Sequence, residues 1–213
     1  MLPTLQRLLC VIFLSAAAAA RPFDAGPMLL EPGPTGMTVV VYHATPVAPT
    51  LTYHPADRPD EKSTSARGER GTRHAFVLTG LAPDTRYQYR VTAGEWNSGP
   101  CTFHTPPADP EKYLMLAAGD LRTQPDRFRE VAEAMRKHEP RALCWITTGD
   151  FPADGRDYRM WLRHFFIPGR ELLSTIPIWP CIGNARAHAH QRRRTRSRQP
   201  LLRVVSLRRR PPH

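Results

Sequence analysis

The order of hydrophobic and polar positions divides the chain into two regions with different structure. Between residues 21 and 107 the hydrophobic positions form short runs that are rich in β-branched and aromatic residues. Glycine, proline and aspartate separate these runs, and none repeats with the 3.6-residue period of a helix. Because several short strands bury their hydrophobic faces by packing as two sheets, this region predicts an all-β sandwich. The predicted strands are Met37–Thr45, Leu51–His54, Arg73–Leu81, Tyr87–Ala93 and Cys101–Thr105.

The pattern changes after a proline-rich joint at residues 105–112. A continuous hydrophobic run, Tyr113–Ala118, ends in Gly-Asp, as expected for a strand that is buried on both faces. An amphipathic helical stripe follows, and then a run ending in a second Gly-Asp, a second stripe and a run ending in Gly-Asn. This β-α-β-α-β order predicts the first part of an α/β domain with a parallel sheet over residues 113–184. We expect Trp161 and Trp179 in its core.

Oxygen-bearing side chains follow all three of these hydrophobic runs. Asp120, Asp150 and Asn184 each come directly after a glycine. Because ligands of open α/β sheets collect at the carboxyl ends of the strands, we expect the three side chains to lie close together. Carboxylate and amide oxygens suit divalent metal ions, and one carboxylate can bridge two ions. The alternative is structural: a cap after a buried strand for the aspartates, and a Gly-Asn turn for Asn184.

Two motifs resemble known families. The run LTGLAPDTRYQYRV, Leu78–Val91, resembles a fibronectin type III domain, in which Tyr87 would form the tyrosine corner. The ordered endings GD, GD and GN resemble the calcineurin-like metallophosphoesterases. Within that family the purple acid phosphatase branch often carries a fibronectin-like domain before the catalytic one. The resemblance covers Gly36–Asn184.

The resemblance implies a site and an activity. In that family the first aspartate binds one metal ion, the second bridges two ions and the asparagine binds the other, so Asp120, Asp150 and Asn184 inherit these roles. The implied cofactors are two ions of iron, zinc or manganese. The implied reaction is acid-phosphatase-like hydrolysis of a small phosphomonoester by a hydroxide that the two metal ions bind.

The sequence departs from the family after Asn184. The family has His-Glu or His-Asp next, where the histidine contacts phosphate or protonates the leaving group, whereas this chain has Ala185-Arg186 and no later Gly-His-x-His. Ala153 stands where the purple enzymes have a tyrosine ligand. We therefore assign no catalytic side chain and expect an incomplete, inactive family member. The alternative function is a non-catalytic exported binding module built on the sandwich.

Charge changes the interpretation of the last residues. A net charge of +11 and a pI near 10.2 suggest a nucleic-acid or anionic-membrane partner. Residues 185–213 hold ten arginines and no acidic residue, however, and without them the net charge is +1. We therefore expect no nucleic-acid partner and interpret residues 185–213 as a basic, disordered tail. A nucleic-acid or anionic-lipid arm is the alternative.

We hypothesise that the reading frame shifts after Asn184 and truncates the ancestral domain. The codons for His-Glu read Ala-Arg after one inserted G, and out-of-frame reading of a GC-rich gene yields arginine, alanine, proline and histidine, the composition of residues 185–213. A sheet that lacks its remaining strands is then expected to leave an unpaired edge.

Residues 1–20 predict an export signal. One positive charge precedes the hydrophobic run Leu8–Ala20, which ends in an A-x-A cleavage site. The run is 13 residues long, whereas about 20 are needed to cross a bilayer. We therefore expect a secreted or periplasmic protein without a stable membrane anchor, and the sequence assigns no oligomeric state. The remaining cysteines, Cys101, Cys144 and Cys181, are compatible with one disulfide but do not require one.

Overall fold

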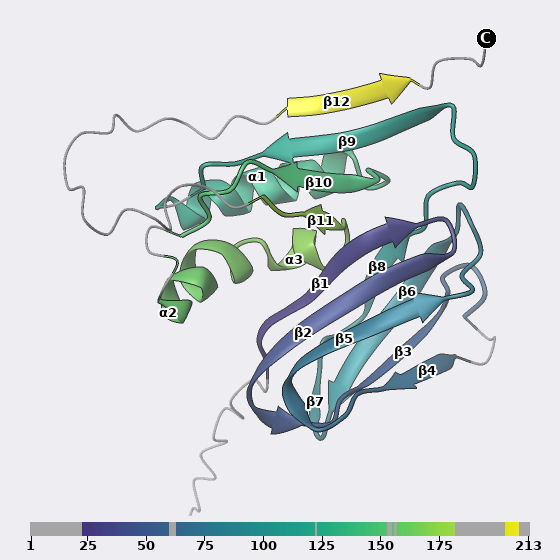
Figure 1. Cartoon of the computed structure of the whole chain (residues 1–213), viewed down its shortest axis with the longest axis vertical. Coiled ribbons are helices and arrows are strands. Elements are labelled where there is room, and N and C mark those ends of the chain that lie inside the picture. The colour runs from purple at the N-terminus through teal and green to yellow at the C-terminus, as the bar shows by residue number, and fades with distance from the viewer. Residues whose placement is uncertain are drawn as a thin grey trace, which may run out of the picture.

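The computed structural model describes residues 23–59, 63–121, 123–152, 155, 157–181 and 203–208, with side chains for all of these except 23–24 and 203–208. The fold is a β-sandwich followed by the first part of an α/β domain, which confirms the predicted fold class (Figure 1). The export signal at residues 1–20, Ala153 and Asn184 lie outside the described residues.

Two antiparallel sheets form the sandwich. One has the strand order β1-β2-β5, and the other has the order β4-β3-β6-β7, with β8 also paired to β6. Along β5 buried and exposed residues alternate, because successive side chains of a strand point to opposite faces. The strands are β1 (Phe23–Gly33), β2 (Gly36–Val47), β3 (Thr50–Pro55), β4 (Thr64–Arg67), β5 (Gly71–Thr79), β6 (Arg86–Ala93), β7 (Trp96–Asn97) and β8 (Cys101–His104).

The loop before β6 closes the sandwich in the way that the sequence predicts. The Tyr87 hydroxyl accepts a hydrogen bond of 2.8 Å from the Ala82 N–H, which confirms the tyrosine corner. The Tyr87 ring stacks on Phe103 in the core, with ring centroids 5.3 Å apart. Thr105 is fully buried, and its hydroxyl donates to the Ala82 carbonyl at 2.7 Å. These bonds fix the end of the sandwich from which the chain enters the α/β part.

The α/β part is built on a four-stranded sheet of order β11-β10-β9-β12. Strands β9, β10 and β11 are parallel, as predicted. Two helical segments connect them, and the second contains a π-helical turn. The elements are β9 (Lys112–Ala118), α1 (Pro125–His138), β10 (Cys144–Thr147), α2 (Tyr158–Trp161), the π-helical turn η1 (Leu162–Phe166), α3 (Arg170–Leu173), β11 (Ile178–Trp179) and β12 (Arg203–Arg208).

Both helical segments pack on the same core. Phe128 of α1 and Phe165 of η1 are parallel, with ring centroids 6.0 Å apart, and both rings contact the fully buried Trp145 of β10. Trp161 packs at the edge of this core, but the prediction that Trp179 is buried is wrong. Neighbouring residues of a strand face opposite sides, so Ile178 is 2% exposed whereas Trp179 is 57% exposed.

The tail differs from its prediction in one segment. Residues 203–208 form β12, which pairs antiparallel with β9 from Arg203 opposite Ala117 to Arg208 opposite Lys112. The expectation of disorder throughout residues 185–213 is therefore wrong for these six residues. The β9 edge of the sheet is paired, because β12 lies beside β9, and β12 and β11 are the outer strands of this sheet (Figure 1).

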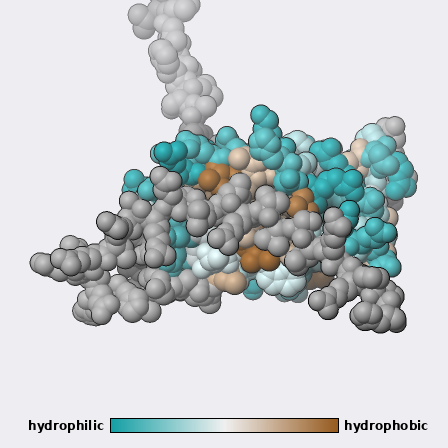
Figure 2. Space-filling view, turned by 90° about the horizontal axis from the view of Figure 1, so that it is seen from above, coloured by the Kyte–Doolittle hydropathy of each residue, from teal (hydrophilic) through white to brown (hydrophobic). Residues whose placement is uncertain are grey.

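The sandwich and the α/β part share an interface that β1 provides. Met28 and Leu30 of β1 pack against the α/β core, and the Tyr89 hydroxyl donates a buried hydrogen bond of 2.8 Å to the Ser174 carbonyl. From above, the described surface has hydrophobic residues near its middle and hydrophilic residues around them (Figure 2). Among the helices that the structure describes, none has the length and apolar character needed to cross a membrane.

Candidate metal centre

The two predicted carboxylates lie at the carboxyl ends of adjacent parallel strands. Asp120 follows β9 and Asp150 follows β10, and the two strands pair in register from Met115 opposite Cys144 to Ala118 opposite Thr147. Both aspartates are half-buried. Because the strands are neighbours and run in the same direction, their ends bring the two aspartates to the same edge of the sheet.

Each aspartate has a backbone conformation that aspartate seldom adopts. The φ angle is 59° at Asp120 and 57° at Asp150, which is the left-handed region. A side chain there costs about 1–2 kcal/mol, although Asp and Asn tolerate the region better than most residues. The two strand ends therefore turn in the same way, and strain of this kind concentrates at functional sites.

Glycine allows the two turns to approach each other closely. A Cβ atom added at Gly119 would lie 1.7 Å from the Thr148 Oγ1 atom and 3.0 Å from the Thr148 backbone nitrogen. No side chain larger than hydrogen fits in that space. The glycine that precedes the first aspartate is therefore required by its contact with the second turn.

Backbone hydrogen bonds hold the turns together. The Asp120 N–H donates to the Gly149 carbonyl at 3.2 Å, so the first turn is attached directly to the second. The Gly149 N–H donates to the Oγ1 atom of Thr147, which is fully buried, at 3.1 Å. These bonds fix the backbone of both carboxylates before any ligand binds.

The chemistry of this arrangement suits a hard cation, but the described residues supply only part of a metal site. Carboxylate oxygens are ligands for divalent ions, and both aspartates stand on a fixed backbone. Within the described ranges no group of three or more His, Cys, Asp or Glu side chains is placed to hold a metal ion. The third predicted ligand, Asn184, lies outside these ranges.

Two other titratable groups of the α/β part have shifted pKa values. Burial raises the pKa of the Cys144 thiol to about 11, so this group is a neutral thiol at neutral pH. Burial and the nearby Arg163 lower the pKa of His164. All three cysteines that the structure describes are free thiols, so no disulfide forms among them.

The sequence of the sandwich matches a known family. Residues 30–105 match the family described as Purple acid Phosphatase, N-terminal domain. The sandwich is therefore similar to a purple acid phosphatase N-terminal domain. This domain contains the tyrosine corner, and its last residue, Thr105, leads into the proline-rich joint before β9. The match confirms the purple acid phosphatase-like resemblance for the N-terminal part of the chain.

One solved structure shows a similar fold beyond the part that resembles a purple acid phosphatase N-terminal domain. A structure of PhoD aligns with a TM-score of 0.59 and 14% identity, over 75% of this chain and 38% of that one, so this chain spans less than half of its length. The FN1–FN3 domains of chicken CNTN1 align over 41% of this chain and 32% of that one, with a TM-score of 0.33 and 17% identity. No curated protein matches the chain in sequence.

Proposed function

We propose that this chain is an exported metallophosphoesterase-family member that keeps the metal-binding aspartates but lacks the histidines needed for turnover. Asp120 and Asp150 would hold divalent or trivalent ions, with Asp150 between two ions and Asn184 on the second. The observation that carries the proposal is the pair of left-handed aspartates on hydrogen-bonded turns, in a chain whose sandwich is similar to a purple acid phosphatase N-terminal domain.

A bound ion would neutralise charge that develops on the phosphoryl oxygens of a small phosphoester. The chain's own contribution is to hold two carboxylates on a rigid backbone, so little reorganisation is needed for binding. The residue that follows Asn184 is alanine, which can neither donate a proton to the leaving group nor bind phosphate through its side chain. Metal binding without turnover is therefore the expected state of this chain.

Metal binding is tested by titrating the purified full-length chain with Mn²⁺ or Zn²⁺. The variants Asp120→Asn and Asp150→Asn remove one charge each, and asparagine also tolerates the left-handed region, so their backbones are kept. We expect each to weaken metal binding at least about tenfold. Asp126→Asn is the matched control, because Asp126 lies in the first turn of α1 and forms an exposed ion pair with Arg129.

Turnover is tested by hydrolysis of an aryl phosphate with and without a chelator. Metal binding that depends on Asp120 and Asp150, together with background hydrolysis, supports the proposal. Hydrolysis above background that the chelator abolishes contradicts the absence of turnover. Equal metal affinity in all variants contradicts the metal site and favours the alternative, an exported module that binds a partner through its sandwich.

A further inference from the structure

A small pocket lies at the joint between the sandwich and the α/β part. Its volume is about 60 Å³. Its walls come from the end of β8, the prolines of the joint, the start of β9 and the turn between α1 and β10. Lys112 begins β9, whereas Asp120 follows the other end of that strand. This joint pocket is therefore at the opposite edge of the sheet from the candidate metal centre.

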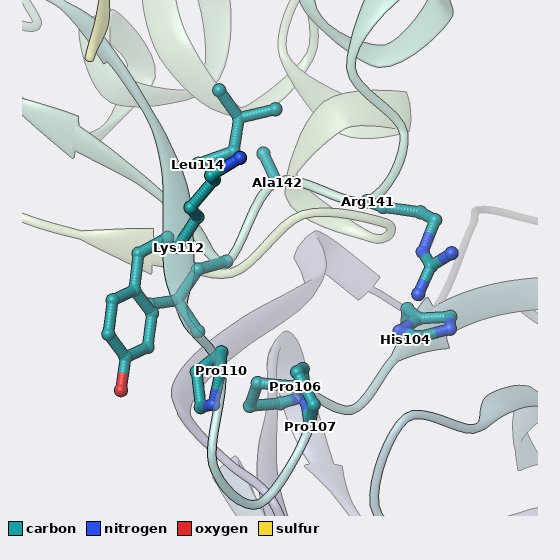
Figure 3. A pocket seen from close by; sticks show the side chains of 10 residues that line it. His104, Pro106, Pro107, Pro110, Lys112, Leu114, Arg141 and Ala142 are labelled. Carbon is teal, nitrogen blue, oxygen red and sulfur yellow. The ribbon is translucent and has the colours of Figure 1, made fainter. Parts of the chain in front are cut away.

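The side chains that line the joint pocket supply hydrogen-bond donors, two of which are cationic. Pro106, Pro107 and Pro110 form rigid walls without backbone N–H groups. The polar groups at the pocket include His104, Lys112 and Arg141. Figure 3 shows the Arg141 guanidinium facing the His104 ring, with Lys112 on the other side of the pocket, beside Leu114.

One carboxylate is already present beside these donors. An Asp84 oxygen accepts a hydrogen bond from Arg141 and lies 3.7 Å from the His104 Nε2 atom. Asp84 is held in place because its N–H donates to the Pro106 carbonyl at 3.1 Å. A guanidinium carries five N–H donors, so Arg141 has donors for an anion while it keeps Asp84.

The charged side chains that act on His104 have a net positive charge. Arg86 lies directly opposite His104 in the β6–β8 ladder, and Arg141 and Lys112 come from the α/β part. Asp84 is the carboxylate that faces His104, whereas Asp109 and Glu111 lie in the joint on either side of Pro110 and outside the pocket lining. The side chains that line the pocket include Arg141 and Lys112 and no carboxylate, so the lining carries positive charge, which attracts an anion.

We propose that the joint pocket binds a tetrahedral oxyanion, namely a phosphate group or its isostere sulfate, through Arg141, His104 and Lys112. Its volume fits one such group, and the guanidinium fork has the geometry that binds phosphate oxygens in pairs. Because its walls come from both parts of the chain, the bound anion joins them. The inference does not depend on the proposed metal centre, which is at the other edge of the sheet.

The pH dependence of binding follows from His104. Burial first, and then the positive charge of Arg141, lower the pKa of His104, while Asp84 opposes them. At neutral pH the ring is therefore uncharged, and it gains a proton as the pH falls through this lowered pKa. Each added proton strengthens attraction for an anion, so affinity rises as the pH falls, and a bound anion raises the His104 pKa.

The test uses the full chain and sulfate, which keeps its charge across this pH range. Sulfate is titrated against chloride at constant ionic strength, and binding is measured by calorimetry and by the NMR shift of the His104 ring. We expect a saturable shift, a higher His104 pKa in sulfate, and tighter binding at pH 5.5 than at pH 7.5. His104→Gln identifies the signal and removes the pH dependence.

Charge variants locate the site. Arg141→Gln and Lys112→Gln should each weaken sulfate binding about fivefold, as expected for the loss of one charge-assisted hydrogen bond. Lys137→Gln is the matched control, because Lys137 is exposed in the last turn of α1, away from the pocket. Arg141→Gln also loses the bond to Asp84, so Lys112→Gln keeps the test valid if that variant unfolds. A linear, non-saturating response, or equal affinities for Lys112→Gln and Lys137→Gln, overturns the proposal.

A second titration separates the two sources of the phosphate group. Inorganic phosphate and phenyl phosphate are compared in the same assay. Preference for inorganic phosphate assigns the pocket to the free ion, and equal affinity assigns it to the phosphate group of a larger molecule that extends into solvent. Failure of both to compete with sulfate contradicts a phosphate site.

Discussion

At the scale of single residues, the metal-centre turns show how two glycines act for different reasons. Gly149 has a φ of 86°, a conformation that glycine adopts without strain. Gly119 instead provides space, since its missing Cβ would overlap the Thr148 side chain. The two glycines of the repeated Gly-Asp motif therefore meet different requirements: Gly149 allows a positive φ, and Gly119 leaves space for the Thr148 side chain.

Substitution of Gly119 by alanine tests the steric requirement. The added Cβ would lie 1.7 Å from the Thr148 Oγ1 atom, so one turn has to move. We expect the free energy of unfolding, measured by urea denaturation, to fall by about 2 kcal/mol, with a loss of metal affinity because the Asp120 backbone shifts.

Gly94→Ala is the control for this substitution. Gly94 has a positive φ of 60° but no atom within 4 Å of an added Cβ, so it tests conformational strain without overlap. We expect it to lower stability by about 1 kcal/mol without an effect on metal binding. If Gly119→Ala is as stable as the wild type, the two turns are not in contact as described.

The sequence predicted the position of the two aspartates better than their surroundings. Strand-end Gly-Asp motifs are visible because they follow continuous hydrophobic runs. The contact between Gly119 and Thr148 could not be predicted, since it depends on the distance between two strands that are separated in the chain. The joint pocket was missed for the same reason: His104, Lys112 and Arg141 share no motif or spacing.

At the scale of elements, β12 forms the outer strand of the α/β sheet on the β9 side. Antiparallel pairing with β9 gives one edge of the parallel sheet a partner from the tail, a strand that begins at Arg203, 24 residues after Trp179 (203 − 179). An open edge is a template for association with other chains. We predicted no structure for residues 185–213 because the segment as a whole is rich in arginine. The short run RVVSLR at residues 203–208, which forms the strand, did not stand out against that composition.

A pair of proline substitutions tests whether β12 pairs with β9 and protects its edge. Adjacent residues of a strand direct their N–H groups to opposite sides, so only one of Val204 and Val205 donates toward β9. Proline removes that donor, and proline at an edge strand is tolerated where the N–H faces solvent. We expect one of Val204→Pro and Val205→Pro to increase amide exchange in β9 and to promote oligomers in light scattering.

The other member of the pair is its own control, because it has the same composition and an intact ladder. Equal behaviour of both variants and the wild type would show that β12 does not protect the β9 edge. Increased exchange in β9 without oligomers would confirm the pairing and contradict its role in preventing association.

The elements that sequence analysis missed share a physical cause. β1 contains Gly26, Pro27 and Pro32, residues that signal turns, and register shifts in its pairing with β2 accommodate them. β4 and β7 are short and exposed or half-buried, so they lack a hydrophobic pattern. The strands that were predicted are those whose buried residues alternate, as in β5, or whose hydrophobic residues run continuously, as in β9.

At the scale of the whole molecule, the two parts are coupled by contacts of different kinds. Hydrophobic side chains of β1 enter the α/β core, and the rings of Tyr42 and Phe166 lie with centroids 6.2 Å apart. The ion pair between Asp84 and Arg141 is exposed, so it contributes little by itself. The hydrogen bond from Tyr89 to the Ser174 carbonyl is a buried polar link within the interface.

Tyr89→Phe tests whether this bond couples the two parts. Tyr89 is 1% exposed, and the loss of its hydroxyl leaves the Ser174 carbonyl without this buried donor. We expect the free energy of unfolding to fall by about 2 kcal/mol and hydrogen exchange to increase first in α3, which ends beside Ser174. Tyr87→Phe is the matched control, because it removes a hydroxyl that bonds Ala82 within the sandwich. A similar loss of stability without faster exchange in α3 is expected there. Coupling through Tyr89 is contradicted if both variants leave α3 equally protected, since the other contacts of the interface then hold the two parts together.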